Sequence, residues 1–165
     1  MRRKDREMDE GFALSVADKC EYAVLSVVRR DGAPYGVPLS IARSGEYIYF
    51  HCAGEGEKVD ALRLNPKVCL TCVGDTNRLK DEFSTEYESA VIFGTASEVE
   101  DDSEKLEALR LICSRHTPEN MAQFEPEAER SFKITHVWRI HISGITGKRK
   151  KYDSAGKEMK FGRME

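Results

Sequence analysis

The feature that most constrains the fold is a pair of tight turns joining strand-like runs near the start of the chain. One turn, at residues 31–34, separates the run 22–28 from the run 35–42, and a second, at Ser44-Gly45, precedes the run 47–52. Turns this short join antiparallel strands, because a parallel pair needs a crossover of about a dozen residues or more. The segment therefore predicts an antiparallel meander and argues against a parallel Rossmann sheet.

The rest of the chain alternates between strand-like patterns, in which every second residue is apolar, and helix-like patterns, in which apolar residues recur every three or four positions. Residues 68–73, 87–99 and 134–145 indicate strands, the second bent at Gly94, and residues 74–85 indicate a polar loop. Helical patterns cover residues 11–20, 57–65 and 101–115, with a polar helix or helix pair at 118–130, and Asp101 with Glu104 is typical of a helix start. We therefore expect a mainly β fold, a six-stranded antiparallel split barrel with peripheral helices.

Domain organisation and cellular context follow from length and charge. The 165 residues suit one domain spanning 1–165, with a short N-terminal helix and a loose basic tail from about residue 148. A net charge of −3 with 33% charged residues gives no global basic field, so we expect no nucleic-acid partner. The basic N-terminus precedes no apolar stretch and no run of about 18 apolar residues occurs, so we expect a cytoplasmic protein with no membrane partner.

The cysteines form an odd set of five. Without a secretion signal, this number indicates reduced thiols rather than a disulfide framework. Cys69 and Cys72 have the spacing of a metal or redox pair, but the two would face opposite sides of a strand. We interpret them as buried structural thiols, with metal or redox work as the alternative. His136 and His141 likewise have no spacing that indicates a metal site, and we expect none.

A possible anion site lies where the third strand-like run ends. Residues 48–53 lead into a loop with Gly54 and Gly56, followed by Lys58 at the start of a predicted helix. A strand end, two glycines, a helix N-terminus and a cation together suit a phosphate group. The alternative is a solvated lysine on a surface helix.

Four segments carry a resemblance when taken in order: residues 36–40, residues 48–53 with Gly56 and Lys58, residues 87–91 and residues 145–149. Together they resemble the split-barrel flavoproteins related to pyridoxamine 5'-phosphate oxidase, and within that family the Nim-type nitroimidazole resistance proteins. In this family FMN lies in a groove between two subunits. The resemblance therefore implies an FMN-binding homodimer.

The resemblance also implies roles for individual residues. Lys58 matches the position whose cation meets the FMN phosphate. The strand that runs along the flavin ring is matched by Val37, Pro38, Leu39 and Ser40. Since Pro38 cannot donate a ladder hydrogen bond, it belongs at an edge or irregular position; an edge strand without a ligand is the alternative. Ser89 on the facing strand either hydrogen-bonds the cofactor or faces solvent.

Further candidate residues lie at a strand end and near the C-terminus. His51 and Cys52 match positions close to the flavin, and we assign His51 the catalytic role; a packed imidazole without a chemical role is the alternative. Alternation puts His51 on the face of its strand opposite Phe50. Trp138 lies in a strand that supplies groups near the flavin or the dimer seam, and Lys148 approaches a bound anion; core packing and a solvated tail are the respective alternatives.

The chain departs from the oxidase pattern in the phosphate loop. The oxidases carry an arginine directly before the lysine and a further basic residue, whereas here Glu55 and Glu57 flank Gly56. Fewer cations weaken phosphate capture. The departure favours a Nim-like site over oxidase chemistry.

The expected function is reduction of a small organic acceptor, such as a nitroaromatic, by FMN that receives electrons from NAD(P)H or another donor. Three alternatives stay open: a pyridoxamine 5'-phosphate oxidase-like enzyme, a non-catalytic flavin-binding or haem-binding protein using His51, and an interaction protein with an empty barrel. The oxidase alternative would need a second phosphate site for its substrate, and the sequence near the C-terminus does not indicate the arginine and histidine cluster that such a site requires.

Overall fold

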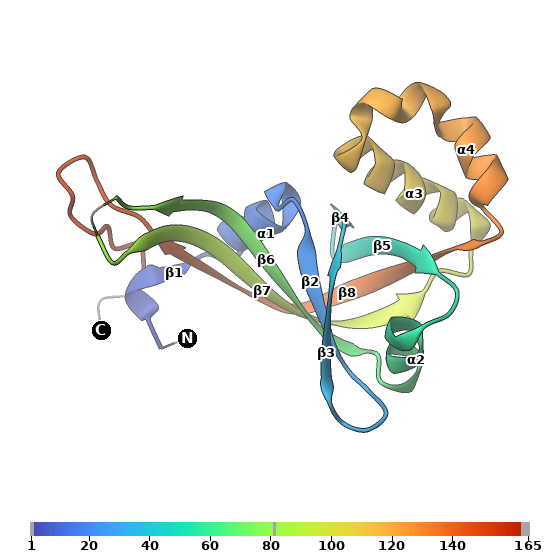
Figure 1. Ribbon diagram of the computed structural model, residues 1–165, viewed down its shortest axis with the longest axis horizontal. Helices are drawn as coiled ribbons and strands as arrows, with labels where there is room; N and C mark the ends of the chain where they lie inside the picture. Colours follow the sequence, from blue (N-terminus) through green and yellow to red (C-terminus); the bar gives the residue numbers. More distant parts are fainter. Residues whose placement is uncertain (1, 81, 163–165) are drawn as a thin grey trace.

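The computed structural model describes residues 2–80 and 82–162. One antiparallel sheet contains eight strands in the order β3-β2-β6-β7-β8-β5-β4, with β1 paired to β8 (Figure 1). The strands are β1 (Glu7–Met8), β2 (Ala23–Val28), β3 (Pro34–Leu39), β4 (Ala42–Ser44), β5 (Tyr47–Ala53), β6 (Lys67–Arg78), β7 (Thr85–Glu98) and β8 (Thr135–Lys150). The antiparallel arrangement is confirmed. The six longer strands are the predicted ones, and β1 and β4 are short additions.

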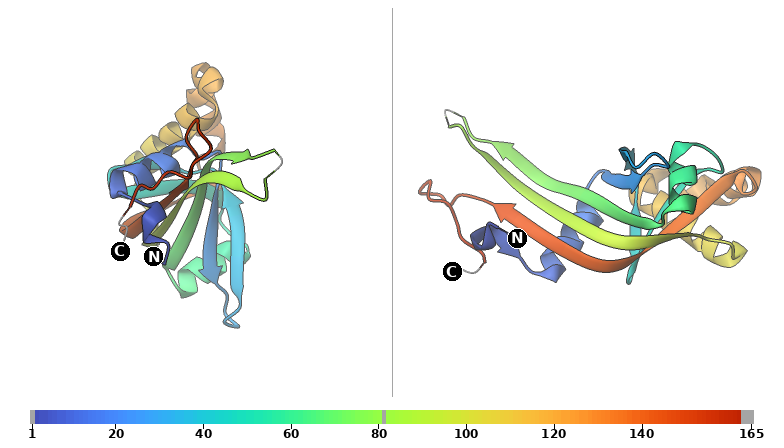
Figure 2. Two further views of the ribbon diagram at one scale, coloured as in Figure 1. Left: turned by 90° about the vertical axis from the view of Figure 1, so that its left-hand side faces the viewer. Right: turned by 90° about the horizontal axis from the view of Figure 1, so that it is seen from below.

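The helices lie around the sheet rather than between parallel strands (Figures 1 and 2). They are α1 (Glu10–Lys19), α2 (Glu57–Leu64), α3 (Asp102–His116) and α4 (Phe124–Ser131), with short 3-10 helices η1 (Lys4–Arg6) and η2 (Pro118–Gln123). The predicted start of α3 is confirmed, since Asp101 accepts a hydrogen bond from the Glu104 amide at 2.8 Å. None of the helices in the described ranges has the length and apolar character needed to cross a bilayer.

Two strands extend beyond their predicted ends. β6 continues to Arg78, where a polar loop was expected, because the ladder with β7 resumes at Thr76↔Tyr87 after an irregularity that follows Val73. β8 likewise continues to Lys150, paired with Tyr87. In both segments backbone pairing sustains the strand although its side chains are polar. Figure 2 shows the resulting long, curved β6, β7 and β8.

The predicted bend at Gly94 is confirmed. The register between β7 and β8 shifts between Phe93 and Gly94. A Cβ atom at Gly94 would lie 2.5 Å from the carbonyl oxygen of His141 and 2.5 Å from Ile140 Cγ2. Glycine is therefore required for the close approach of the two strands.

The buried residues form two clusters. The main cluster packs against the inward face of the curved sheet and includes Phe50, Leu25 and Trp138. The second joins Val137 on the other face of β8 to α3 and α4, through Leu109 and Phe124. The helical pair α3 and α4 thus has its own small core beside the end of the sheet that carries β4 and β5 (Figure 1).

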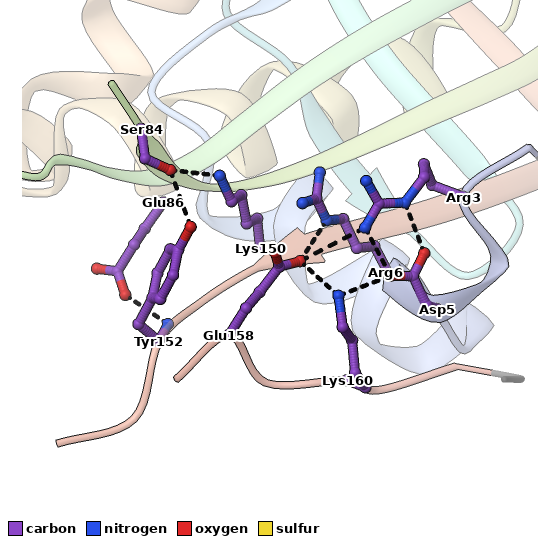
Figure 3. Close-up of polar contacts among 9 residues, drawn as sticks. All are labelled: Arg3, Asp5, Arg6, Ser84, Glu86, Lys150, Tyr152, Glu158 and Lys160. Atoms are coloured by element: carbon purple, nitrogen blue, oxygen red, sulfur yellow. Dashed lines mark hydrogen bonds and ion pairs between the residues drawn. The ribbon is translucent and has the colours of Figure 1, made fainter. Parts of the chain in front are cut away.

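The residues after β8 make specific contacts, in contrast to the loose tail expected from about residue 148 (Figure 3). Glu158 accepts a hydrogen bond from Arg6 Nε at 2.7 Å, and Lys160 Nζ donates to Asp5 at 2.8 Å. The Phe161 amide donates to the Asp5 carbonyl at 3.0 Å. Ion pairs between distant parts of the chain therefore hold this segment against η1, an arrangement that local sequence composition cannot reveal.

Candidate functional site

The anion site predicted from the sequence falls at the amino end of α2. Gly56 precedes the helix with φ at +115°, a conformation that favours glycine, and has no side chain to cap the first turn. By contrast, α1 and α3 each begin with an aspartate that accepts an amide hydrogen bond. A Cβ at Gly56 would meet nothing within 4 Å, so there is room beside the helix end. This arrangement suits a bound anion.

Lys58 extends from α2 toward the end of β5. Its Nζ lies 5.8 Å from the centroid of the Phe50 ring. Cys52, on the same face of β5 as Phe50, packs against the main core, and burial raises the pKa of its thiol while the nearby Lys58 charge opposes the rise. Cys52 is therefore a neutral wall of the site rather than a reactive thiolate.

His51 lies on the opposite face of β5 from Phe50, as alternation predicts, and pairs with Val137 of β8. Although the residue is exposed overall, desolvation of the imidazole lowers its pKa, and the positive charges of Lys58 and His116 lower it further. The His116 ring is fixed separately by its Nε2, 2.8 Å from the Ile41 carbonyl oxygen. A neutral His51 imidazole has both a donor and an acceptor nitrogen available near Lys58.

The strand predicted to run along the flavin is β3, an edge of the sheet that, within the described part of the chain, pairs only with β2. Its Pro38 is exposed, in keeping with the edge position predicted for a residue without an amide hydrogen. Val37 and Leu39 turn inward and pack against the main core, as Cys52 does, and Ser40 follows the strand exposed. The backbone groups on the open edge of β3 can hydrogen-bond a flat polar ligand.

Trp138 is buried at 3% exposure and belongs to the main core, opposite Phe50 on the neighbouring strand. Its indole Nε1 has no hydrogen-bond partner among the described residues. Burying such a donor without an acceptor costs about 1–3 kcal/mol. A bound polar group or a water molecule would supply the missing acceptor.

Ser89 and Lys148 are direct cross-strand neighbours on β7 and β8, but they lie far from Lys58 within one chain. Ser89 precedes Glu98, the residue paired with Trp138, by nine positions. At about 3.3 Å per residue this corresponds to roughly 30 Å along the strand. Lys148 Nζ instead lies 5.5 Å from the centroid of the Tyr87 ring. The structure therefore does not bring all the predicted cofactor residues together within this single chain.

The outward face of the sheet carries three exposed apolar side chains among polar ones. Val28, Val73 and Phe93 are 41%, 51% and 50% exposed on β2, β6 and β7. Their strands are adjacent, with Ser26, Cys69 and Phe93 in one cross-strand row. Pro38, Ser89 and Lys148 lie on the same face, as the register of these strands shows. We call this surface the outer sheet face.

Two ion-pair groups near α2 were missed by the sequence analysis. Arg29, at the end of β2, donates from Nε to Glu57 at 2.9 Å. Glu98 hydrogen-bonds the Nδ1 of His136 and forms an ion pair with Arg63 at 3.2 Å. The His136 ring lies against the phosphate loop, because a Cβ atom on Gly54 would clash with it. These ion pairs join segments that are distant in sequence, so they depend on the fold, and no local sequence motif indicates them.

The residues present fit FMN in two respects. The uncapped first turn of α2, with Lys58 beside it, suits the phosphate, and the open edge of β3 suits the polar edge of the ring. Among the described residues no group of three or more His, Cys, Asp or Glu side chains could hold a metal ion. The free cysteines Cys69 and Cys72 occupy opposite faces of β6, half-buried and buried respectively.

Comparisons with solved structures show the same fold in several proteins. A candidate 5-nitroimidazole antibiotic resistance protein from Bacteroides thetaiotaomicron superimposes with a TM-score of 0.71 at 23% identity, covering 87% of this chain and 86% of that one. An FAD-binding protein from Mesorhizobium loti gives 0.65 at 23% identity, covering 88% and 98%. An FAD and haem binding protein from Mycobacterium smegmatis gives 0.75 at 19% identity, covering 96% and 84%.

The sequence itself was compared in two further ways. A search of curated proteins finds no match. A family model described as pyridoxamine 5'-phosphate oxidase matches residues 11–149, which includes β2 to β7, α2 and most of β8. With the antiparallel split-barrel fold and the site at α2, this match shows that the chain belongs to the pyridoxamine 5'-phosphate oxidase family.

Proposed function

We propose that the protein is an FMN-binding flavoprotein that reduces a small organic acceptor. The observation that carries the proposal is the uncapped amino end of α2 beside Lys58, in a chain of this family. Lys58 and the first-turn amides would hold the FMN phosphate by charge-assisted hydrogen bonds. The free edge of β3 would orient the flavin ring.

The active form in this proposal is a homodimer with FMN at the subunit interface. Three exposed apolar side chains lie on the outer sheet face, and exposed apolar surface can mark a contact with another protein. If a second copy covers it, Ser89 and Lys148 of one subunit can approach the α2 site of the other. This would explain why, within one chain, Ser89 lies roughly 30 Å along β7 from Glu98, the residue paired with Trp138.

Bound FMN would supply the two-electron redox chemistry, and the chain would supply binding, orientation and polar tuning. His51 stays neutral at pH 7, because its pKa is lowered from 6.5, and its imidazole N–H can donate a hydrogen bond to an acceptor substrate. The first candidate acceptor is a nitroaromatic compound such as a nitroimidazole, with NADH or NADPH as donor. A pyridoxamine phosphate substrate would need a second phosphate site.

The first experiment is an absorbance spectrum and mass measurement of the purified protein, before and after addition of FMN. We expect a flavin spectrum and release of FMN on denaturation, with weaker FMN binding in Lys58→Met than in the control Lys67→Met. A colourless protein that takes up no added FMN would refute the proposal.

Activity requires a separate test. The FMN-loaded protein should reduce a nitroimidazole with NADH or NADPH in steady-state assays, and His51→Ala should lower kcat. A protein that binds FMN but reduces no acceptor with either donor is a flavin carrier or sensor rather than an enzyme.

Haem binding is the second candidate function. A neutral, exposed imidazole at His51 is a suitable axial ligand, and one structural relative is described as an FAD and haem binding protein. Haemin titration tests it: a Soret band lost in His51→Ala supports haem ligation, and an unchanged band excludes His51 as the ligand.

A further inference from the structure

The phosphate loop carries more negative than positive charge of its own. Glu55 and Glu57 both lie within the stretch that ends at Lys58. A phosphate dianion placed at the amino end of α2 would be repelled by these carboxylates, since like charges a few ångströms apart raise the energy of the bound state. A site for this ligand needs a further cation close to Glu57.

Arg29 lies at that position, although it is distant in sequence. Its backbone is fixed at the base of the β2–β3 turn: the Arg29 amide donates to the Ala33 carbonyl and its own carbonyl accepts from Gly32, each at 2.9 Å. Its side chain crosses to α2 and donates from Nε to Glu57 Oε1 at 2.9 Å. The guanidinium is thus held beside the first residue of the helix.

The contact with Glu57 leaves the far end of the Arg29 side chain available. One terminal nitrogen forms an ion pair with Asp31 at 3.7 Å, which is beyond hydrogen-bond distance. Neither terminal nitrogen makes a hydrogen bond within residues 2–80 and 82–162. A guanidinium anchored through Nε can present these two nitrogens to a phosphate in a fork. Glu57 therefore acts as the group that orients a cation.

We propose that Arg29 is a second phosphate-binding residue of this chain, donating from its terminal guanidinium nitrogens to the phosphate of FMN, with Glu57 as its positioning residue. The inference rests on the proposed function, because it assumes FMN at the amino end of α2. It adds a ligand contributed by the β2–β3 turn, outside the loop that carries Lys58.

The test compares the affinity of the full chain for FMN and for riboflavin, which lacks the phosphate, by flavin fluorescence titration. Arg29→Gln should raise the Kd for FMN by about tenfold or more, since a charge-assisted bond is lost, and leave the Kd for riboflavin unchanged. The matched control is Arg130→Gln, which removes the same charge from an exposed position on α4, away from α2, and should change neither Kd.

A double variant separates direct contact from charge neutralisation. If Arg29 merely offsets the charge of Glu57, then Glu57→Gln should restore FMN affinity in the Arg29→Gln background. We expect no restoration, because the donated hydrogen bonds stay absent. Restoration to the wild-type Kd would overturn the direct contact.

The remaining outcomes are also decisive. Equal weakening of FMN and riboflavin binding by Arg29→Gln would show a structural role and overturn the inference. An FMN Kd in Arg29→Gln equal to that in Arg130→Gln would overturn it as well. In both cases FMN binding by the wild-type chain would still support the proposed function. Failure of the wild-type chain to bind FMN would instead overturn both.

Discussion

At the scale of single residues, His51 offers the most direct electrostatic test. Its pKa is lowered by desolvation and then by the charge of Lys58. In Lys58→Met the pKa of His51 should therefore rise toward 6.5 without reaching it, because the desolvation remains. Histidine NMR titration measures this shift, with Lys67→Met as a control that should leave the His51 pKa unchanged.

The lowered pKa of His51 also determines how its contribution to the free energy of unfolding changes with pH. Since the unfolded chain binds a proton at His51 more readily than the folded one, protonation favours unfolding. The stabilising contribution of neutral His51 should decline as the pH falls below 6.5. A wild-type His51 pKa at or above 6.5 would contradict the electrostatic description of the site.

Gly94 tests the packing of the bend between β7 and β8. Gly94→Ala would place a methyl group 2.5 Å from the His141 carbonyl oxygen and from Ile140, so we expect a loss of about 1–3 kcal/mol in the free energy of unfolding. Gly144→Ala, in the paired strand, has nothing within 4 Å of the added carbon and is the control. Urea denaturation of both variants measures the difference, and equal stabilities would refute the clash.

At the scale of elements, the C-terminal segment should open under acid. The Arg6 hydrogen bond lowers the pKa of Glu158 from 4.5 to about 2. A lowered carboxyl pKa stabilises the folded arrangement above pH 4.5, and this contribution is lost as the pH falls from 4.5 toward 2. The segment should therefore detach from η1 across this range.

Glu158→Gln should produce the same detachment at neutral pH. We expect faster amide hydrogen exchange at Phe161, whose amide donates to Asp5, with the exchange of β7 unchanged. Glu125→Gln removes a comparable ion pair with Arg110 on α3 and should not affect Phe161. Slow exchange at Phe161 in Glu158→Gln would mean that packing rather than the ion pairs holds the segment.

Much of the fold follows from local sequence, and the exceptions have a common cause. The short turns at Gly32 and Gly45, the Asp101 start of α3 and the bend at Gly94 are properties of neighbouring residues, and each was predicted. The polar ends of β6 and β8 were missed, since their strand structure depends on pairing with β7. Arg29 was missed for the same reason, because its partner Glu57 is brought near only by the fold.

At the scale of the whole molecule, the outer sheet face predicts self-association. Phe93→Glu would place an unpaired carboxylate in the proposed dimer interface, so the dimer Kd should rise by at least about 100-fold. Ile134→Glu changes a 75% exposed apolar residue elsewhere and is the control, expected to remain dimeric. Light scattering coupled to size exclusion measures both.

Two results would contradict the dimer prediction. A wild-type protein that is monomeric at micromolar concentration would remove the interface altogether. A dimer that dissociates in Ile134→Glu but persists in Phe93→Glu would place the interface on a different surface.

The position of β8 in the sheet has a consequence for how the chain folds. Among the strands that the structure describes, β8 alone joins β3-β2-β6-β7 on one side to β5-β4 on the other, and it is made from residues 135–150. During synthesis, the edges of β5 and β7 that pair with β8 stay unpaired until this segment leaves the ribosome. Such late, long-range closure slows folding and exposes strand edges to other chains. Transient protection of these edges by a chaperone would therefore matter most before residues 135–150 are free to pair.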